Sequence, residues 1–300
     1  MYKNVWKQRG KSAILSAMKK TIARIQIEGV IEKENDNYNQ KWLLETIEEL
    51  TEDKKTAGII LYINSPGGGV YESDEVYTAL KKYKEKTKKP VWAYSAALAA
   101  SGGYYIGCSA DRIIANRNTL TGSIGVIAGR FVDLTALMNK HGIKSETIHA
   151  GRNKTMGSFD QPVTQEQREI MQAVADECYQ QFTALVAENR RLELDAVKEL
   201  ADGRIYTALQ AKARGLVDDI ATFDDAVDML KEQLFGSKDA KASVRKYEPK
   251  KKRSLRKLLK GAAWSMGSPL AADAGAALTQ LIGKKQLPFP AYYYDNGAIW

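Results

Sequence analysis

Hydrophobic and polar positions change repeatedly between the periods of strands and helices over the first 235 residues. Residues 21–31 alternate apolar and polar side chains as a strand does, and the apolar residues of 37–50 recur at helical spacing. Residues 57–63 are continuously apolar, which is typical of a strand covered on both faces. A glycine-rich loop over 64–69 and a helix over 71–86 are expected next.

The same alternation continues further along the chain. A helix that starts with a Thr-x-x-Gln capping box, Thr164 and Gln167, is predicted over 164–191. Residues 201–234 are expected to form a short turn and two helices. Strands that alternate with helices predict an α/β layer fold with right-handed crossovers. Five elements are predicted between the helix over 71–86 and the helix over 164–191. They are a strand over 90–95, a turn entering a helix over 99–110, a strand over 111–116, a helix over 131–142 and a strand over 143–150.

One stretch, Pro90–Ala110, has 21 residues without a charge. A membrane-spanning helix needs about 20 mostly apolar residues. This stretch has that length, but it contains three Ser, three Gly and three Tyr and has a centre of small residues. Its composition therefore favours a buried strand, a turn and a core helix over a membrane span.

Charge divides the chain into unequal parts. Residues 236–300 contain 13 Lys and Arg against 4 Asp and Glu, whereas residues 1–235 contain 32 of each, so the tail accounts for the net charge of +9. We therefore predict a basic N-terminal segment over 1–20, a folded domain over 21–235 and a basic, then aromatic, tail over 236–300. The apolar part of the N-terminal segment is too short for a secretory signal, and no membrane anchor is expected there.

The two cysteines, Cys108 and Cys178, lie in apolar segments that are expected to be helical. Two cysteines make no disulfide framework, and no CxxC motif or histidine cluster is present. We interpret both as buried thiols and expect neither a metal site nor a cofactor.

A candidate nucleophile follows the predicted strand 90–95. In "AASGGYY", Ser101 and two glycines stand where a helix would begin. The N–H groups in the first turn of a helix lack internal partners, so a serine there can present its hydroxyl beside unpaired donors. Gly102 and Gly103 would let a substrate backbone approach closely. An ordinary N-cap serine with packing glycines is the alternative interpretation.

A second loop, "NSPGGG", follows another buried strand in the same way. Pro66 fixes the turn, and Gly67–Gly69 expose backbone N–H groups. Loops at the carboxyl ends of two neighbouring strands lie close together. One of them could supply a nucleophile and the other an oxyanion donor.

A serine nucleophile needs a base. His141 is expected to end a helix and His149 a strand, so neither lies in a loop suited to a substrate. Lys154, in "GRNKTMGS", could act in the neutral form that burial favours. Its alternative is a solvated surface lysine. The segment "TLTGSIGV" offers hydroxyls that could hold such an amine, Ser123 first and Thr121 second.

Together these segments resemble the signal peptide peptidase A family of Ser–Lys serine proteases. The resemblance covers about residues 20–235 and includes "GIILYINSPGGGVYESDEVY", "AASGGYYIGCSADRIIA", "TLTGSIGVI" and "GRNKTMGS", together with "LADGRIYTALQAKARGLVDDI". It implies a ClpP/crotonase-like β-α spiral. Residue by residue it implies Ser101 as nucleophile, Lys154 as general base, Gly68 and Gly102 as the oxyanion hole, and Ser123 as the residue that orients the amine.

The resemblance also implies substrates and partners. The expected substrates are remnant signal peptides and similar apolar peptides, cleaved through an acyl-enzyme. A chain with one protease unit is expected to form a homo-oligomeric ring whose sites combine Ser101 and Lys154 from neighbouring protomers. The expected location is the cell membrane with the active domain facing outside, although the missing anchor leaves a cytoplasmic location open.

Three rival interpretations remain. A ClpP-like Ser–His–Asp protease would need a histidine soon after the nucleophile, but the first histidine, His141, comes 40 residues after Ser101. A crotonase-type acyl-CoA enzyme would need carboxylates beside the glycine loops. A non-enzymatic binder could use the basic tail on anionic lipid or nucleic acid. No nucleic-acid motif is present, so we expect a membrane-surface contact or a solvated arm and no nucleic-acid partner.

The end of the tail makes a further prediction. Residues 287–300, "LPFPAYYYDNGAIW", are extended by two prolines and rich in aromatic residues. A disordered end is one interpretation. The other is an extended strand that pairs with a sheet edge in the substrate groove and competes with peptides.

Overall fold

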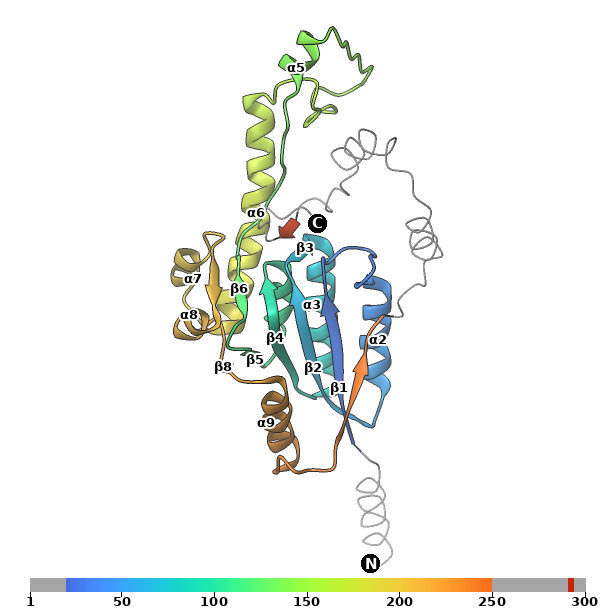
Figure 1. Cartoon of the computed structure of the whole chain (residues 1–300), viewed down its shortest axis with the longest axis vertical. Coiled ribbons are helices and arrows are strands. Elements are labelled where there is room, and N and C mark those ends of the chain that lie inside the picture. The colour runs from blue at the N-terminus through green and yellow to red at the C-terminus, as the bar shows by residue number, and fades with distance from the viewer. Residues whose placement is uncertain (1–19, 250–290, 294–300) are drawn as a thin grey trace, which may run out of the picture.

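The computed structural model of the protein describes residues 20–249 and 291–293. In these residues an eight-stranded sheet has the order β7-β6-β4-β2-β1-β9, with β5 paired to β4 and β8 paired to β5 (Figure 1). Strands β3 (Gly67–Gly69) and β10 (Ala291–Tyr293) form a separate two-stranded sheet. The strands of the large sheet are β1 (Thr21–Glu28), β2 (Thr56–Ser65), β4 (Val91–Ala100), β5 (Arg112–Ala115), β6 (Leu120–Gly122), β7 (Ile205–Thr207), β8 (Asp219–Ile220) and β9 (Ser243–Tyr247).

All neighbouring pairs in the large sheet are parallel except β6–β7. Strand β4 forks: residues 92–95 pair with β5, and residues 98–100 pair with β6. The fork releases the end of β4 from β5, and Ser101 follows directly. The described helices are α2 (Gln40–Glu52), α3 (Val70–Thr87), α4 (Gly102–Gly107), α5 (Thr135–Lys140), α6 (Gln165–Arg190), α7 (Leu194–Leu200), α8 (Ala208–Ala213) and α9 (Phe223–Phe235).

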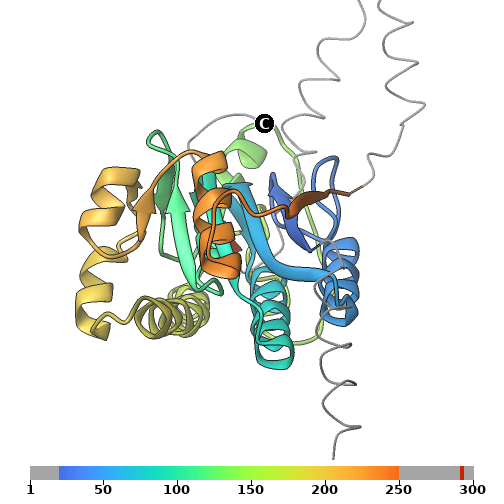
Figure 2. The same cartoon turned by 90° about the horizontal axis from the view of Figure 1, so that it is seen from below.

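Two hydrophobic clusters cover the two faces of the sheet. The larger one joins β1, β2 and β4 to α2, α3, α4 and α6, and the smaller one packs α9 against the opposite face (Figure 2). In β1, Ile22 belongs to the smaller cluster, whereas Ala23 and Ile25 belong to the larger one. This division confirms the α/β layer fold predicted from strand and helix periodicity.

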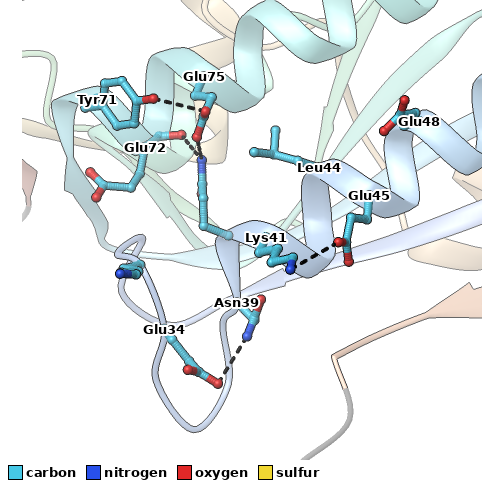
Figure 3. A pocket seen from close by; sticks show the side chains of 11 residues that line it. Glu34, Asn39, Lys41, Leu44, Glu45, Glu48, Tyr71, Glu72 and Glu75 are labelled. Carbon is cyan, nitrogen blue, oxygen red and sulfur yellow. Dashed lines mark hydrogen bonds and ion pairs between the residues drawn. The ribbon is translucent and has the colours of Figure 1, made fainter.

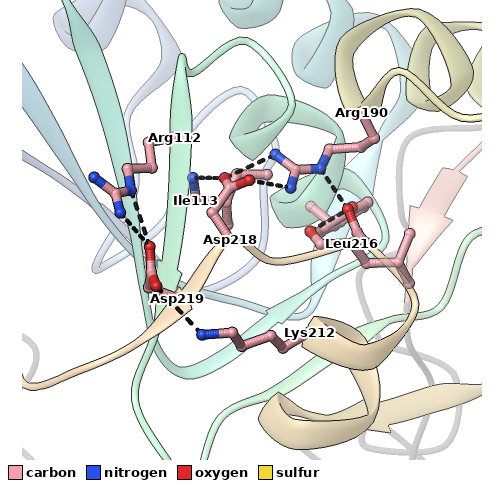
Figure 4. A network of polar contacts seen from close by, with 9 residues as sticks. Arg112, Ile113, Arg190, Lys212, Leu216, Asp218 and Asp219 are labelled. Atoms are coloured by element: carbon pink, nitrogen blue, oxygen red, sulfur yellow. Dashed lines mark hydrogen bonds and ion pairs between the residues drawn. The ribbon is translucent and has the colours of Figure 1, made fainter.

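Helix α6 is anchored to the sheet at its C-terminal end. The guanidinium of Arg190, only 7% exposed, donates to both carboxylate oxygens of Asp218, at 2.9 and 2.6 Å, and to Gly215 O. Asp218 in turn accepts from the backbone N–H of Ile113 in β5 (Figure 4). The base of α6 is therefore held firmly against the sheet.

The other end of α6 carries an arm, which we define as residues 125–164. Figure 1 shows α5 and the loops around it beyond the N-terminal end of α6, at the end of the molecule away from α9. The predicted capping box at Thr164 and Gln167 is present and starts this helix. With 26 residues, α6 is about 39 Å long at a rise of 1.5 Å per residue.

The arm exposes many large apolar side chains. Ile148 is 96% exposed, and Val132, Leu137, Ile143 and Phe159 are each more than half exposed. A single exposed apolar residue is ordinary, but a concentration of this kind marks an interaction surface. The strand predicted over 143–150 is wrong: these residues are irregular and exposed, with no neighbouring strand to pair with.

Several other predictions can be compared with the structure. The uncharged stretch forms β4, the turn and α4, as expected, and none of the described helices is long and apolar enough to cross a membrane. Cys108 is buried as predicted, but Cys178 on α6 is partly exposed. Strand β9, which the sequence placed in the tail, pairs with β1 in the main sheet. The N-terminal segment before Lys20 and most of the tail lie outside the described residues.

Candidate active site

Ser101 lies on a strained turn between β4 and α4. Its backbone has φ 53° and ψ −119°, a conformation that non-glycine residues rarely adopt. The turn is held from both sides: Ser101 N–H donates to Gly122 O at 2.8 Å, and Ser101 O accepts from Tyr105 N–H at 2.8 Å. Strain of this kind persists only where the surroundings fix it, and it concentrates at functional sites.

The side chain of Ser101 is buried but lacks a hydrogen bond. Its Oγ has no partner among the described residues. A buried hydroxyl without a partner is costly in a folded protein, so its presence needs a reason. A hydroxyl kept ready for a substrate and a base provides that reason.

The glycine loop lies directly beside Ser101. Gly67–Gly69 form β3, and an added Cβ on Gly102 would lie 3.2 Å from Gly68 N. That Cβ would also come within 2.4 Å of Ser73 Oγ, so a side chain at position 102 would displace the Ser73 hydroxyl, which donates to Gly69 O. The structure therefore brings together Ser101, Gly68 and Gly102, as the sequence predicted for neighbouring loops.

The direction of the Gly68 N–H follows from its neighbours in β3. Gly67 O accepts from Ile31 N–H, and Gly69 N–H donates to Ile31 O, both at 2.8 Å. Successive residues of a strand direct their N–H and C=O groups to opposite edges. The Gly68 N–H is therefore directed away from Ile31, toward the edge that pairs with β10.

Strand β10 (Ala291–Tyr293) runs antiparallel to β3, with Tyr292 opposite Gly68. Of the two interpretations of the aromatic end, the extended strand paired with a sheet edge agrees with this pairing. Figure 1 shows β10 at the top of the sheet beside β3. An extended segment thus pairs with the edge of the glycine strand that faces away from Ile31.

Ser123 also lies near Ser101. It is buried, with φ 50°, and its N–H donates to Arg204 O at 2.8 Å. The preceding residue, Gly122, accepts the hydrogen bond from Ser101, so the two serines are linked through one backbone segment. Thr121, the second candidate for orienting the amine, instead donates its hydroxyl to Ala99 O at 2.6 Å.

Lys154 is not brought to Ser101 within one chain. It lies in a turn of the arm, is exposed, and its N–H donates to Gly151 O at 3.0 Å. Nearby, Arg152 forms an ion pair with Glu166 in the first turn of α6, which ties the turn to this helix. His141 and His149 lie exposed on the same arm. The body therefore holds the candidate nucleophile, Ser101, and the arm holds the three candidate bases, Lys154, His141 and His149.

Burial excludes one other nucleophile. Cys108 is fully buried at the end of α4, and burial raises the pKa of its thiol to about 12, against the smaller opposing effect of Arg190. The thiol is protonated near neutral pH, and a protonated thiol is a poor nucleophile. Cys108 is therefore part of the core.

A groove of about 560 Å³ lies on the other side of the glycine strand, between α2 and α3 (Figure 3). Residues such as Leu44, Tyr71 and Glu75 line it, and Ser101 does not. It is thus distinct from the surroundings of Ser101. The contacts beside this groove, in which the connection after β1 forms hydrogen bonds with the glycine strand, were not predicted from the sequence.

Comparisons with known proteins identify the family of the chain. The model of peptidase family S49 matches residues 83–235, and the Clp protease model matches residues 10–130. An Enterococcus faecium protein named "Putative signal peptide peptidase SppA" is 35% identical over 93% of this chain and 83% of its own length. The chloroplast serine protease SPPA of Arabidopsis thaliana is 37% identical over 64% of this chain and 28% of its own length.

Haemophilus influenzae Protease 4 is 31% identical over 69% of this chain and 34% of its own length. Among solved structures, a ClpP1 mutant from Listeria monocytogenes matches with a TM-score of 0.47 and 17% identity, over 72% of this chain and 97% of that chain. The fold and site define a serine protease with a ClpP-like α/β fold. The chain belongs to peptidase family S49, which confirms the resemblance found in the sequence.

Proposed function

We propose that the protein is an endopeptidase in which Ser101 is the nucleophile and Lys154 of a neighbouring protomer is the general base. The observation that carries this proposal is the buried, unpartnered hydroxyl of Ser101 on a strained turn beside the glycine strand. A nucleophile in this state is ready to react but lacks its base. The only basic candidates that the sequence singled out, Lys154 and the two histidines, lie on the arm.

The oxyanion hole consists of the backbone N–H groups of Gly68 and Gly102. The Gly68 N–H is directed toward the β10 edge, and Gly102 begins α4, where N–H groups lack intrahelical partners. Each donor of this kind is worth about 3 kcal/mol in the transition state.

The catalytic pair forms between two protomers, with Lys154 of one protomer beside Ser101 of its neighbour. The exposed apolar side chains of the arm would be covered in a homo-oligomeric ring, and the same contact would bring Lys154 toward the neighbour's Ser101. Ser123, held beside Ser101 by the backbone of Gly122, orients the lysine amine. A monomer would be inactive.

The reaction proceeds in two stages. The neutral amine of Lys154 takes the proton from Ser101 Oγ as this oxygen attacks the peptide carbonyl, and the two N–H groups hold the resulting oxyanion. The amine proton passes to the leaving nitrogen, which leaves an acyl-enzyme. Water, deprotonated by the same lysine, then releases the acyl group and restores Ser101. The rate should rise with pH, because only the unprotonated amine accepts a proton.

The substrates are extended apolar peptides, with remnant signal peptides the proposed class. Pairing of β10 with β3 supports binding as an antiparallel strand, in which main-chain hydrogen bonds give affinity. We place this activity at the cell membrane with the active domain facing outside, and the basic residues after Tyr247 provide a membrane-surface contact.

The direct test is labelling by a fluorophosphonate, which modifies activated serines. We expect one label per active site, located at Ser101 by peptide mass, and no label on the Ser101→Ala variant. Ser95→Ala is a matched control, because Ser95 is a buried serine of β4, the strand that precedes Ser101. Equal labelling of the Ser101→Ala variant would refute the assignment of the nucleophile.

A further inference from the structure

The connection between β1 and α2 packs against the glycine strand. We call residues 29–39 the arch. Ile31, fully buried in the arch, donates its N–H to Gly67 O and accepts from Gly69 N–H, both at 2.8 Å. The two segments are so close that a Cβ added to Gly68 would lie 1.8 Å from Ile31 O. The arch therefore sets the position of the strand that carries the proposed oxyanion donor.

The hydrogen bond from Ile31 N–H to Gly67 O also orients the proposed oxyanion donor, the N–H of Gly68. The carbonyl of Gly67 and the N–H of Gly68 belong to the same peptide unit, which is planar. When Ile31 N–H fixes the direction of the carbonyl, it also fixes the opposite direction of the N–H. A hydrogen bond to the carbonyl also polarises the unit and strengthens its N–H as a donor.

Asn35 holds the arch in shape. Its amide nitrogen donates to Val30 O at 2.8 Å and to the Glu32 carboxylate at 3.0 Å. Its amide oxygen accepts from the N–H groups of Asn37 and Tyr38, both at 2.9 Å. One side chain thus ties the two sides of the arch together, directly beside Ile31.

A second residue ties the arch to the helix after the glycine strand. Gln40 N–H donates to Lys33 O at 3.1 Å, and the Gln40 amide donates to Glu72 O at 3.1 Å and to the Glu75 carboxylate at 2.8 Å (Figure 3). These acceptors lie at the start of α3, which follows Gly69 directly. The arch and the glycine strand are therefore fixed as one unit.

We propose that Asn35 is a positioning residue of the protease, which aligns the Gly68 N–H through Val30 and Ile31 without touching the substrate. This inference rests on the proposed function, because it requires Gly68 to stabilise the oxyanion. Loss of the Asn35 side chain would leave Val30 O and the arch N–H groups without these partners, and the arch would lose its fixed contact with Gly67.

The effect should appear in the transition state. Loss of an oxyanion donor lowers kcat by about 10²- to 10³-fold, so a misaligned donor should lower it by about 10- to 100-fold. The ground-state peptide does not depend on this donor to the same extent, so KM should change little. Affinity for a peptide aldehyde, whose adduct with serine places an oxygen in the hole, should fall in parallel with kcat/KM.

The experiment compares full-length wild type, Asn35→Ala and the control Asn37→Ala. The control keeps the backbone N–H of residue 37, which donates to the Asn35 side-chain oxygen. Active sites are titrated with a fluorophosphonate, and kcat per titrated site, KM and aldehyde affinity are measured. We expect only Asn35→Ala to lose kcat and aldehyde affinity. An unchanged kcat per site, or a loss that appears equally in KM, would overturn the proposal.

A second variant covers the case in which Asn35→Ala does not fold. Replacing Ile31 by the matching α-hydroxy acid removes the N–H that donates to Gly67 O, and it makes the Val30 carbonyl, which accepts from Asn35, a weaker ester acceptor. It should give the same loss of kcat and aldehyde affinity, and unchanged values would refute the role of the arch. Failure of the proposed function would give a different result, because the Ser101→Ala variant would then keep wild-type activity.

Discussion

The two halves of the proposed catalytic site differ in how firmly the chain holds them. Ser101 is buried, and hydrogen bonds from Tyr105 and to Gly122 fix its unusual backbone. Lys154 is exposed in a turn of the arm, which is held by bonds within the turn, such as Met156 N–H to Asn153 O, and by the ion pair of Arg152 with Glu166. The nucleophile is set by the folded body, whereas the base is carried on a projecting surface.

This difference suggests how activity is controlled. A strained nucleophile needs a rigid core to maintain it. The proposed base lies on an arm that exposes apolar side chains. The catalytic site would therefore become complete only when the surface of another chain covers that arm. The protease would thus assemble its catalytic pair only upon oligomerisation, which keeps an isolated chain inactive.

The largest effect is expected from Lys154→Ala. Loss of one member of a nucleophile–base pair lowers kcat by about 10⁴- to 10⁶-fold. Thermal stability should be unchanged, since Lys154 is exposed. Peptide turnover and the unfolding midpoint are measured on the same preparation.

The histidines of the arm provide matched controls. His149→Ala and His141→Ala change exposed residues of the same arm and should keep near-wild-type turnover. If His149→Ala were inactive while Lys154→Ala kept its activity, the Ser–His–Asp interpretation would replace the Ser–Lys pair.

A smaller effect is expected from the tail. Deletion of residues 284–300, which include β10, should raise turnover of short peptides several-fold, because a tethered competitor acts at high effective concentration. Ring size, measured by mass, should not change.

A single substitution sharpens this test. Tyr292→Pro removes the backbone N–H of the residue opposite Gly68 and should act in the same direction as the deletion, whereas Tyr292→Phe should not. If the deletion leaves the kinetics unchanged, β10 does not compete with peptides and is better interpreted as a surface or membrane contact.

The central sheet and the nucleophile turn could be predicted from local sequence. Buried strands such as residues 57–63 appear as apolar runs, and Ser101 stands out because two glycines follow it at a strand end. The capping box at Thr164 was also predictable, since its signal lies within four residues. These features depend on local propensity, which the sequence displays directly.

Other features depend on distant contacts. The strand predicted over 143–150 does not form, and these residues pair with none of the described strands. Strand β9 was missed because a polar, basic segment became an edge strand on β1. The arch was missed too, since the role of Asn35 depends on the neighbouring glycine strand, about 30 residues further on. No local signal marks such contacts.

The sharing of Ser101 and Lys154 between chains can be tested by complementation. Ser101→Ala and Lys154→Ala chains carrying different tags are co-expressed, and oligomers that contain both tags are purified and confirmed by mass. A site is active only when its serine comes from a Lys154→Ala chain and its lysine from a Ser101→Ala chain. An equal mixture should therefore recover about a quarter of wild-type activity per chain, given random assembly around a closed ring. Proven mixed oligomers that are no more active than either variant alone would contradict the account and place the complete site within one protomer.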